Sequence, residues 1–133
     1  AMVHEVRSVC AHALGAPLSD YDVIFTSNTT EAINLAAGSF GRETGHADEP
    51  VVLNTILEHN SNELPWRMIP GVSLLHLKAD EEGFIDINEL EGLLKDYNQQ
   101  GRHGMKRIRL VAVTGASNVT GVFNNIAEIS RIV

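Results

Sequence analysis

Four short apolar runs, separated by stretches with helical spacing, constrain most strongly what this chain can fold into. The runs are Val23–Thr26, Val51–Asn54, Val72–Leu77 and Ile108–Val113. Runs of this length that are rich in Val, Ile and Leu are typical of strands buried on both faces. Strands that alternate with helices favour a mostly parallel sheet flanked by helices. The sequence therefore predicts a three-layer α/β fold.

Helical spacing occurs between these runs and at both ends of the sequence. The expected helices are residues 1–14 closed by Gly15, a helix from Thr29 to Gly38 or Gly41, Pro65–Ile69, a helix after Asp86, and Ile126–Val133. Asp86 with Glu89 three residues later is typical of a capping box. Because the first and last helical patterns run to the ends, we interpret residues 1–133 as an incomplete domain, cut at both ends.

Three polar stretches follow predicted strands: Ser27–Thr30, Glu58–Asn62 and Thr114–Asn118. Ligands of open α/β sheets bind beyond the carboxyl ends of the strands. The first stretch opens a helix, where unpaired N–H groups and the helix dipole favour an anion such as phosphate. In the alternative interpretation, Ser27 or Thr29 only caps that helix. The convergence of the three stretches favours a ligand that carries a phosphate.

Composition excludes several other classes of protein. The net charge of −7 argues against a nucleic-acid surface, which needs clustered Lys and Arg. No apolar run is long enough to span a membrane. Cys10 is the only cysteine, which rules out an internal disulfide and fits a reducing compartment such as the cytoplasm. Its neighbours Val6 and Val9 on the predicted helix indicate a buried small hydrophobe rather than a reactive thiol.

Two further motifs depart from the patterns that they resemble, and no metal site is predicted. Asp80–Glu89 looks like a calcium-binding loop, but Lys78 stands where the first carboxylate ligand belongs. Val113–Gly121 is similar to the nucleotide-binding turn of short-chain dehydrogenases, but Val119 replaces the middle glycine. The histidines lack metal-ligand spacing. A small phosphate- or nucleotide-binding module and a dehydrogenase-like oxidoreductase remain as alternatives.

The three polar stretches together resemble the class V aminotransferase family, which includes the cysteine desulfurases. Phe25–Asn34 is similar to the family's Thr-Ser-Gly-Thr-Thr-Glu-Ala-Ile-Asn segment. Glu58–Trp66 is similar to its Glu-His-His-Ser-Asn-x-x-Pro-Trp segment, and Ser117–Gly121 to its Ser-Asn-Val-x-Gly turn. Order and spacing agree across nearly the whole chain.

This resemblance implies part of the large domain of a fold type I enzyme that uses pyridoxal 5′-phosphate. Thr29 and Thr30 would hold the cofactor phosphate through backbone N–H groups and the Thr30 hydroxyl. His59 would stack on the pyridine ring, and Asn118 would hydrogen-bond its phenolic oxygen. The full-length enzyme would be a cytoplasmic homodimer that acts on an amino acid, as an aminotransferase or a cysteine desulfurase.

The sequence departs from the family pattern in two respects. Asn28 stands where the family usually has glycine, and asparagine also tolerates a positive φ. The family's cofactor-binding lysine lies further along its sequence, and none of Lys78, Lys95 and Lys106 has the expected His-Lys setting. The resemblance therefore implies half of a site, with no catalytic residue in this chain.

The resemblance also implies an order for the strands. In the fold type I sheet, ordered 3-2-4-5-6-7-1, the second, third and fourth strands lie side by side. These would be Val51–Asn54, Val72–Leu77 and Ile108–Val113. The first strand, Val23–Thr26, would lie at the far edge, beyond strands that this chain does not encode.

Overall fold

The computed structural model describes residues 2–43 and 48–133. Within these residues the sheet has three parallel strands in the order β2-β1-β3. Their bounds are Glu49–Thr55 for β1, Ser73–Leu77 for β2 and Lys106–Val111 for β3. Val51 in β1 pairs with Ser73 on one side and with Ile108 on the other. The expected side-by-side order of the last three apolar runs is confirmed.

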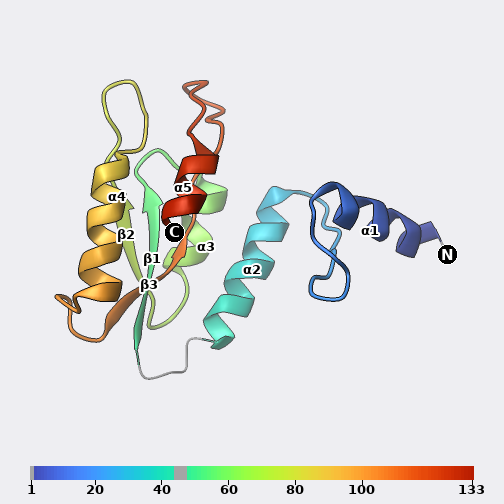
Figure 1. Cartoon of the computed structure of the whole chain (residues 1–133), viewed down its shortest axis with the longest axis horizontal. Coiled ribbons are helices and arrows are strands. Elements are labelled where there is room, and N and C mark those ends of the chain that lie inside the picture. The colour runs from blue at the N-terminus through green and yellow to red at the C-terminus, as the bar shows by residue number, and fades with distance from the viewer. Residues whose placement is uncertain (1, 44–47) are drawn as a thin grey trace.

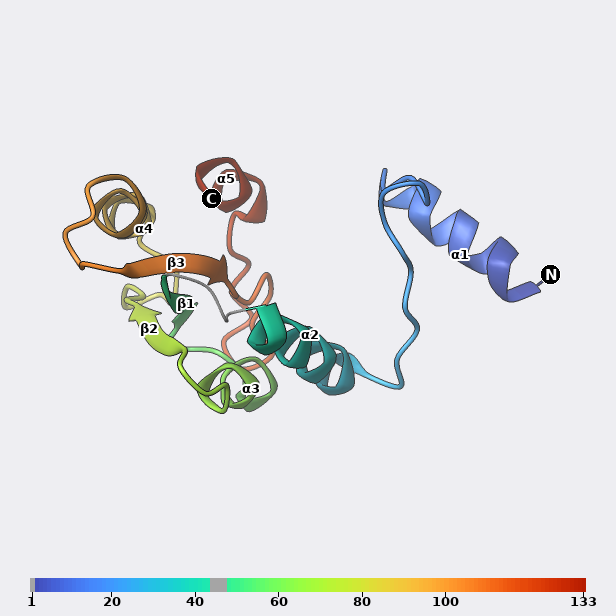
Figure 2. The same ribbon diagram turned by 90° about the horizontal axis from the view of Figure 1, so that it is seen from below.

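Helices cover both faces of this sheet, as Figure 2 shows most clearly. They are α2 (Thr29–Glu43) and α3 (Leu64–Arg67) on one face, and α4 (Ile87–Leu94) and α5 (Ile126–Ile132) on the other. The arrangement is the predicted three-layer α/β fold. None of the helices in the described ranges is long and apolar enough to cross a membrane.

The fold has one apolar core on each face of the sheet, and β1, the central strand, contributes side chains to both. Successive side chains of a strand point to opposite faces. Val51 and Leu53 pack with Leu90 of α4 in one cluster, whereas Val52 packs with Trp66 of α3 in the other. All of these side chains are buried, which is why the run reads as continuously apolar rather than alternating.

Of the helix ends predicted from local sequence signals, the start of α4 agrees with the structure better than the end of α2 does. Asp86 caps α4, since its carboxylate accepts hydrogen bonds from the N–H groups of Asn88 (2.9 Å) and Glu89 (3.1 Å). The Glu89 carboxylate does not complete a capping box but accepts from the N–H of Lys78 at 2.8 Å. Helix α2 was predicted to end near Gly38 or Gly41, and it ends at Glu43, so neither glycine, each without a positive φ, terminates it.

The outer edge of β3 is partly covered by a side chain. Asn98, in the π-helical segment η2 (Lys95–Gln99), accepts from the N–H of Ile108 at 2.9 Å and donates to its carbonyl at 3.0 Å. One carboxamide thus replaces, at this residue, the neighbouring strand that an edge lacks. Such blocking reduces the tendency of an open edge to pair with another chain.

The region before α2 differs from the prediction. Helix α1 (Met2–Ala13) ends as expected at Gly15, whose φ is 63°, but it lies apart from the sheet in Figure 1 and Figure 2. The predicted strand at Val23–Thr26 is wrong: the segment has no strand partner among the described residues and forms no strand. Cys10 is partly exposed rather than buried, because its helix packs on little else.

Candidate functional site

Asn28 organises the start of α2. Its carboxamide oxygen accepts from the N–H of Glu31 at 2.9 Å, and the Glu31 carboxylate accepts from the N–H of Ser27 at 2.7 Å. This hydrogen bond from Ser27 lowers the pKa of Glu31. The expected caps, Ser27 or Thr29, are therefore wrong. Asn28 also needs no positive φ, since no described residue other than glycine has one.

Capping by Asn28 leaves Thr29 and Thr30 available for a ligand. Both are exposed, and no hydrogen bond of either hydroxyl is found in the part of the chain that the structure describes. They occupy the first turn of a 15-residue helix, where N–H groups are unpaired and the dipole attracts anions. The start of α2 therefore has free donors of both kinds, hydroxyl and backbone.

His59 lies in the loop that follows β1 and precedes η1 (Asn60–Asn62). Its Nδ1 accepts from the N–H of Ser61 at 3.1 Å and lies 2.9 Å from the Ser61 hydroxyl. This bond uses the Nδ1 lone pair, which assigns the proton of the neutral ring to Nε2. The ring is held by its own loop while remaining exposed.

Asn118 lies in a tight turn after β3. The Ser117 hydroxyl accepts from the N–H groups of Val119 (3.3 Å) and Thr120 (3.1 Å), and Gly121 closes the turn with a φ of 75°. The Asn118 carboxamide is exposed and makes no hydrogen bond within the described residues. It is free to donate to a ligand.

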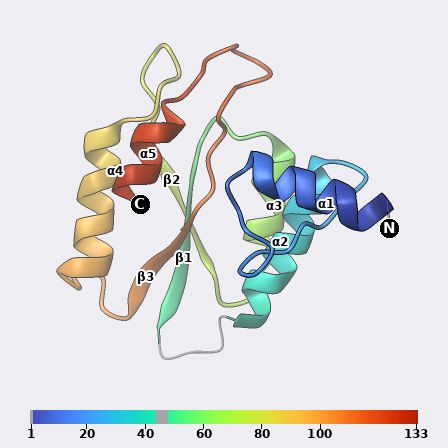
Figure 3. The same ribbon diagram turned by 45° about the vertical axis from the view of Figure 1, so that its right-hand side comes forward.

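One cavity brings three of the four predicted site residues together. Thr29, His59 and Asn118 line a hollow of about 600 Å³, whose wall also contains Thr114. Thr30 instead lines an adjacent groove of about 750 Å³ between α2 and the segment around α3, and His59 borders both spaces. β1 and β3 run toward the same edge of the sheet, so their loops meet there (Figure 3).

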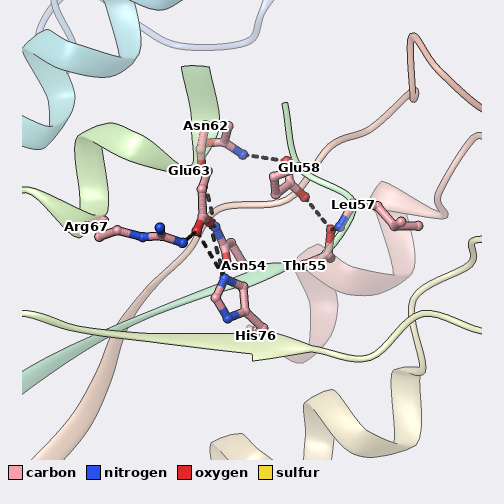
Figure 4. A network of polar contacts seen from close by, with 8 residues as sticks. All are labelled: Asn54, Thr55, Leu57, Glu58, Asn62, Glu63, Arg67 and His76. Atoms are coloured by element: carbon pink, nitrogen blue, oxygen red, sulfur yellow. Dashed lines mark hydrogen bonds and ion pairs between the residues drawn. The ribbon is translucent and has the colours of Figure 1, made fainter. Parts of the chain in front are cut away.

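A polar network around the Glu63 carboxylate connects β1, β2 and α3 (Figure 4). Asn54, at the end of β1, donates to the Glu63 carboxylate at 2.6 Å. Arg67 forms an ion pair with that carboxylate, and His76 Nε2 lies 3.3 Å from each of its oxygens. Burial raises the pKa of Glu63, but the hydrogen bonds from Asn54 and His76 and the charges of His76 and Arg67 outweigh it and lower the pKa.

Comparison with known proteins matches the class-V aminotransferase family over residues 1–133. The chain belongs to this family. It is 37% identical over 132 residues to a cysteine desulfurase of Dickeya dadantii (strain 3937), covering 97% of this chain and 29% of that protein. It is 36% identical to a probable cysteine desulfurase of Methanothermobacter thermautotrophicus, covering 98% of this chain and 29% of that protein. The chain thus spans under a third of these relatives' length.

Solved structures agree on the fold. A NifS-like protein superposes with a TM-score of 0.72 at 23% identity, covering 96% of this chain and 32% of its own. The crystal structure of mouse CSAD superposes with a TM-score of 0.71 at 18% identity, covering 98% and 29%. Membership of the class-V aminotransferase family gives no support to the dehydrogenase or the small phosphate-binding module.

The sequence interpretation missed several residues that organise this part of the fold. Asn28 and Glu31 have the spacing of a capping box, the signal that we used at Asp86 but not here. Asn62 was interpreted only as part of a polar stretch, and Glu63 only as part of the Glu58–Trp66 segment that resembles the family. Their partners Asn54 and His76 lie on two different strands, so no spacing along the chain connects them.

Proposed function

We propose that this chain forms the phosphate- and ring-binding part of a pyridoxal 5′-phosphate enzyme, an aminotransferase or a cysteine desulfurase. The observation that carries the proposal is the single cavity lined by Thr29, His59 and Asn118, which come from three separate segments. An amino-acid substrate, a homodimeric full-length enzyme and a cytoplasmic location belong to the same proposal.

The residues at this cavity, together with Thr30 in the adjacent groove, suit the chemical groups of the cofactor. The free N–H groups and hydroxyls of Thr29 and Thr30 suit a doubly charged phosphate. The exposed His59 ring offers a flat face to a pyridine ring, and the Asn118 carboxamide offers a neutral donor to a phenolic oxygen. When bound, the cofactor supplies an electron sink for the substrate, while the protein orients it.

No lysine of this chain is placed to hold the cofactor covalently. Lys78, Lys95 and Lys106 are all described, and none lines the 600 Å³ cavity or the adjacent groove. We therefore expect the 133-residue chain to show no stoichiometric lysine labelling after borohydride reduction with the cofactor. Intact-mass analysis tests this, and full labelling of one lysine would contradict it.

Cofactor titration of purified variants tests the site itself. Thr30→Val and Asn118→Ala each remove a hydrogen bond to a charged or polarised group and should weaken binding by roughly 1.5–3 kcal/mol. His59→Ala should weaken binding through loss of stacking and slow turnover in the full-length enzyme. Asn88→Ala is the matched control, since Asn88 is also exposed, on α4, with no side-chain hydrogen bond among the described residues. Wild-type affinity in all three site variants would refute the assignment.

A further inference from the structure

Glu58 accepts hydrogen bonds from two strand ends at once. Its Oε1 accepts from the Thr55 hydroxyl (2.8 Å) and the Thr114 N–H (2.9 Å). Its Oε2 accepts from the Asn62 side-chain amide (2.8 Å) and the Thr114 hydroxyl (2.8 Å). Figure 4 shows the carboxylate between Thr55 and Asn62. One partly buried side chain thus connects the loop after β1 with the segment after β3.

These two segments carry the proposed ring contacts. Glu58 directly precedes His59, and Thr114 lies on the segment that leads from β3 to Asn118. Asn62 adds a parallel link, because its side-chain amide also donates to the carbonyl of Ala112 at 3.2 Å. The position of His59 relative to the β3 segment therefore depends largely on the Glu58 carboxylate and its partners.

The hydrogen-bond pattern requires two acceptor oxygens and not merely a polar side chain. Each carboxylate oxygen of Glu58 faces one N–H group that can only donate a hydrogen bond and cannot accept one. The Thr114 donor is a backbone N–H. The Asn62 amide is oriented by Trp66, whose Nε1 donates to the Asn62 carbonyl oxygen at 3.0 Å. A glutamine at this position would place its NH₂ group against one of these donors in either orientation.

We propose that Glu58 is a positioning residue, which holds the His59 loop and the segment leading to Asn118 in the register that cofactor binding requires. The inference rests on the proposed function, since it assumes that both residues contact the cofactor. Glu63, five residues later, is a built-in comparison. Its carboxylate bonds Asn54, Arg67 and His76 but nothing on the β3 segment.

The test compares Glu58→Gln with Glu63→Gln in the purified protein. Hydrogen exchange of peptides that contain Thr114, measured without cofactor, reports the link between the two segments. Titration with pyridoxal 5′-phosphate reports its consequence. We expect Glu58→Gln to increase exchange at Thr114 and to weaken binding at least about tenfold, the loss of one charge-assisted hydrogen bond. Glu63→Gln should change neither.

Thr114→Val keeps the test decisive if Glu58→Gln does not fold. It removes one hydroxyl bond to Glu58 while preserving shape and backbone, so binding should weaken in the same direction by a smaller factor. Unchanged binding in the folded Glu58 variant, or in Thr114→Val if Glu58→Gln does not fold, overturns the inference, as does equal weakening by Glu63→Gln. A wild-type protein that binds no cofactor overturns the proposed function itself, and this inference with it.

Discussion

The sheet layer and the region before α2 carry similar apolar runs but bury them to different extents. Val52 and Leu53 of β1 are both 0% exposed, whereas Ile24 and Phe25 are 63% and 52% exposed. β1 has a strand on each side and helices on both faces, while residues 23–26 have no strand neighbour among the described residues. The difference teaches that an apolar run becomes a strand only when another strand completes its hydrogen bonds.

The helices of the two regions show the same contrast. Leu90 of α4 is fully buried beneath the helix, because the sheet lies opposite its apolar face. Helix α1 also carries apolar residues but leaves Met2, Val3 and Val9 exposed. A helix acquires most of its stability from packing an apolar face, so α1 should be the less stable of the two.

The largest expected effect comes from making one substitution in both regions. Leu53→Ala removes a fully buried side chain at the centre of the sheet and should destabilise the fold by about 2–5 kcal/mol. Leu14→Ala, at a position that is 80% exposed, should change stability by no more than about 0.5 kcal/mol. Urea unfolding measures both. Equal costs would break the comparison and indicate that α1 packs on another surface in solution.

Two glycines of α2, Gly38 and Gly41, differ in how closely the rest of the fold packs against them. A Cβ at Gly41 would lie 2.9 Å from the Cγ2 of Ile69, whereas at Gly38 the nearest atom, in Arg42, is 3.9 Å away. Gly38→Ala should stabilise the protein by about 0.5–1 kcal/mol through helix propensity. Gly41→Ala has the same gain but overpacks a stiff β-branched side chain, at a cost of about 1–3 kcal/mol. Thermal unfolding should therefore shift in opposite directions, and equal stabilisation would show that α2 is loosely packed there.

The smallest effect is a pH dependence that distinguishes two glutamates. The pKa of Glu63 lies below its ordinary value of 4.5, so the unfolded chain binds a proton at a higher pH than the folded protein does. Ionised Glu63 therefore contributes its full stabilisation at a pH above the unfolded pKa. The contribution is lost as the pH falls through the lower pKa of the folded protein. Glu63→Gln should reduce the pH dependence of the free energy of unfolding on the acid side, as measured by urea unfolding.

Glu31 is the control for this measurement. Its pKa is also lowered, by the hydrogen bond from Ser27, but the carboxylate is exposed and solvent screens its interactions. Glu31→Gln should leave the acid limb of urea-unfolding curves nearly unchanged. A larger effect from Glu31 than from Glu63 would contradict the expectation that a partly buried carboxylate contributes more to stability than an exposed one.

Much of the candidate site was predictable, because its residues lie in three recognisable stretches. Thr29, His59 and Asn118 follow from motif order, and the structure places all three at one cavity. The partition of Thr30 into the adjacent groove was not predictable, since it depends on how α2 is rotated against the segment around α3. Nor was the role of Glu58, whose decisive partner Thr114 lies 56 residues away in sequence.

The sequence by itself determined the layers, the central strand and the helix ends that depend on local side chains, such as Asp86 at α4 and Gly15 after α1. Apolar periodicity and capping act over a few residues, so they can be read along the chain. Only the tertiary structure decided which apolar runs are buried and which polar groups pair across strand ends. Burial and long-range hydrogen bonds require a second surface, and that surface is created by folding, as the exposed Phe25 and the bridging Glu58 both demonstrate.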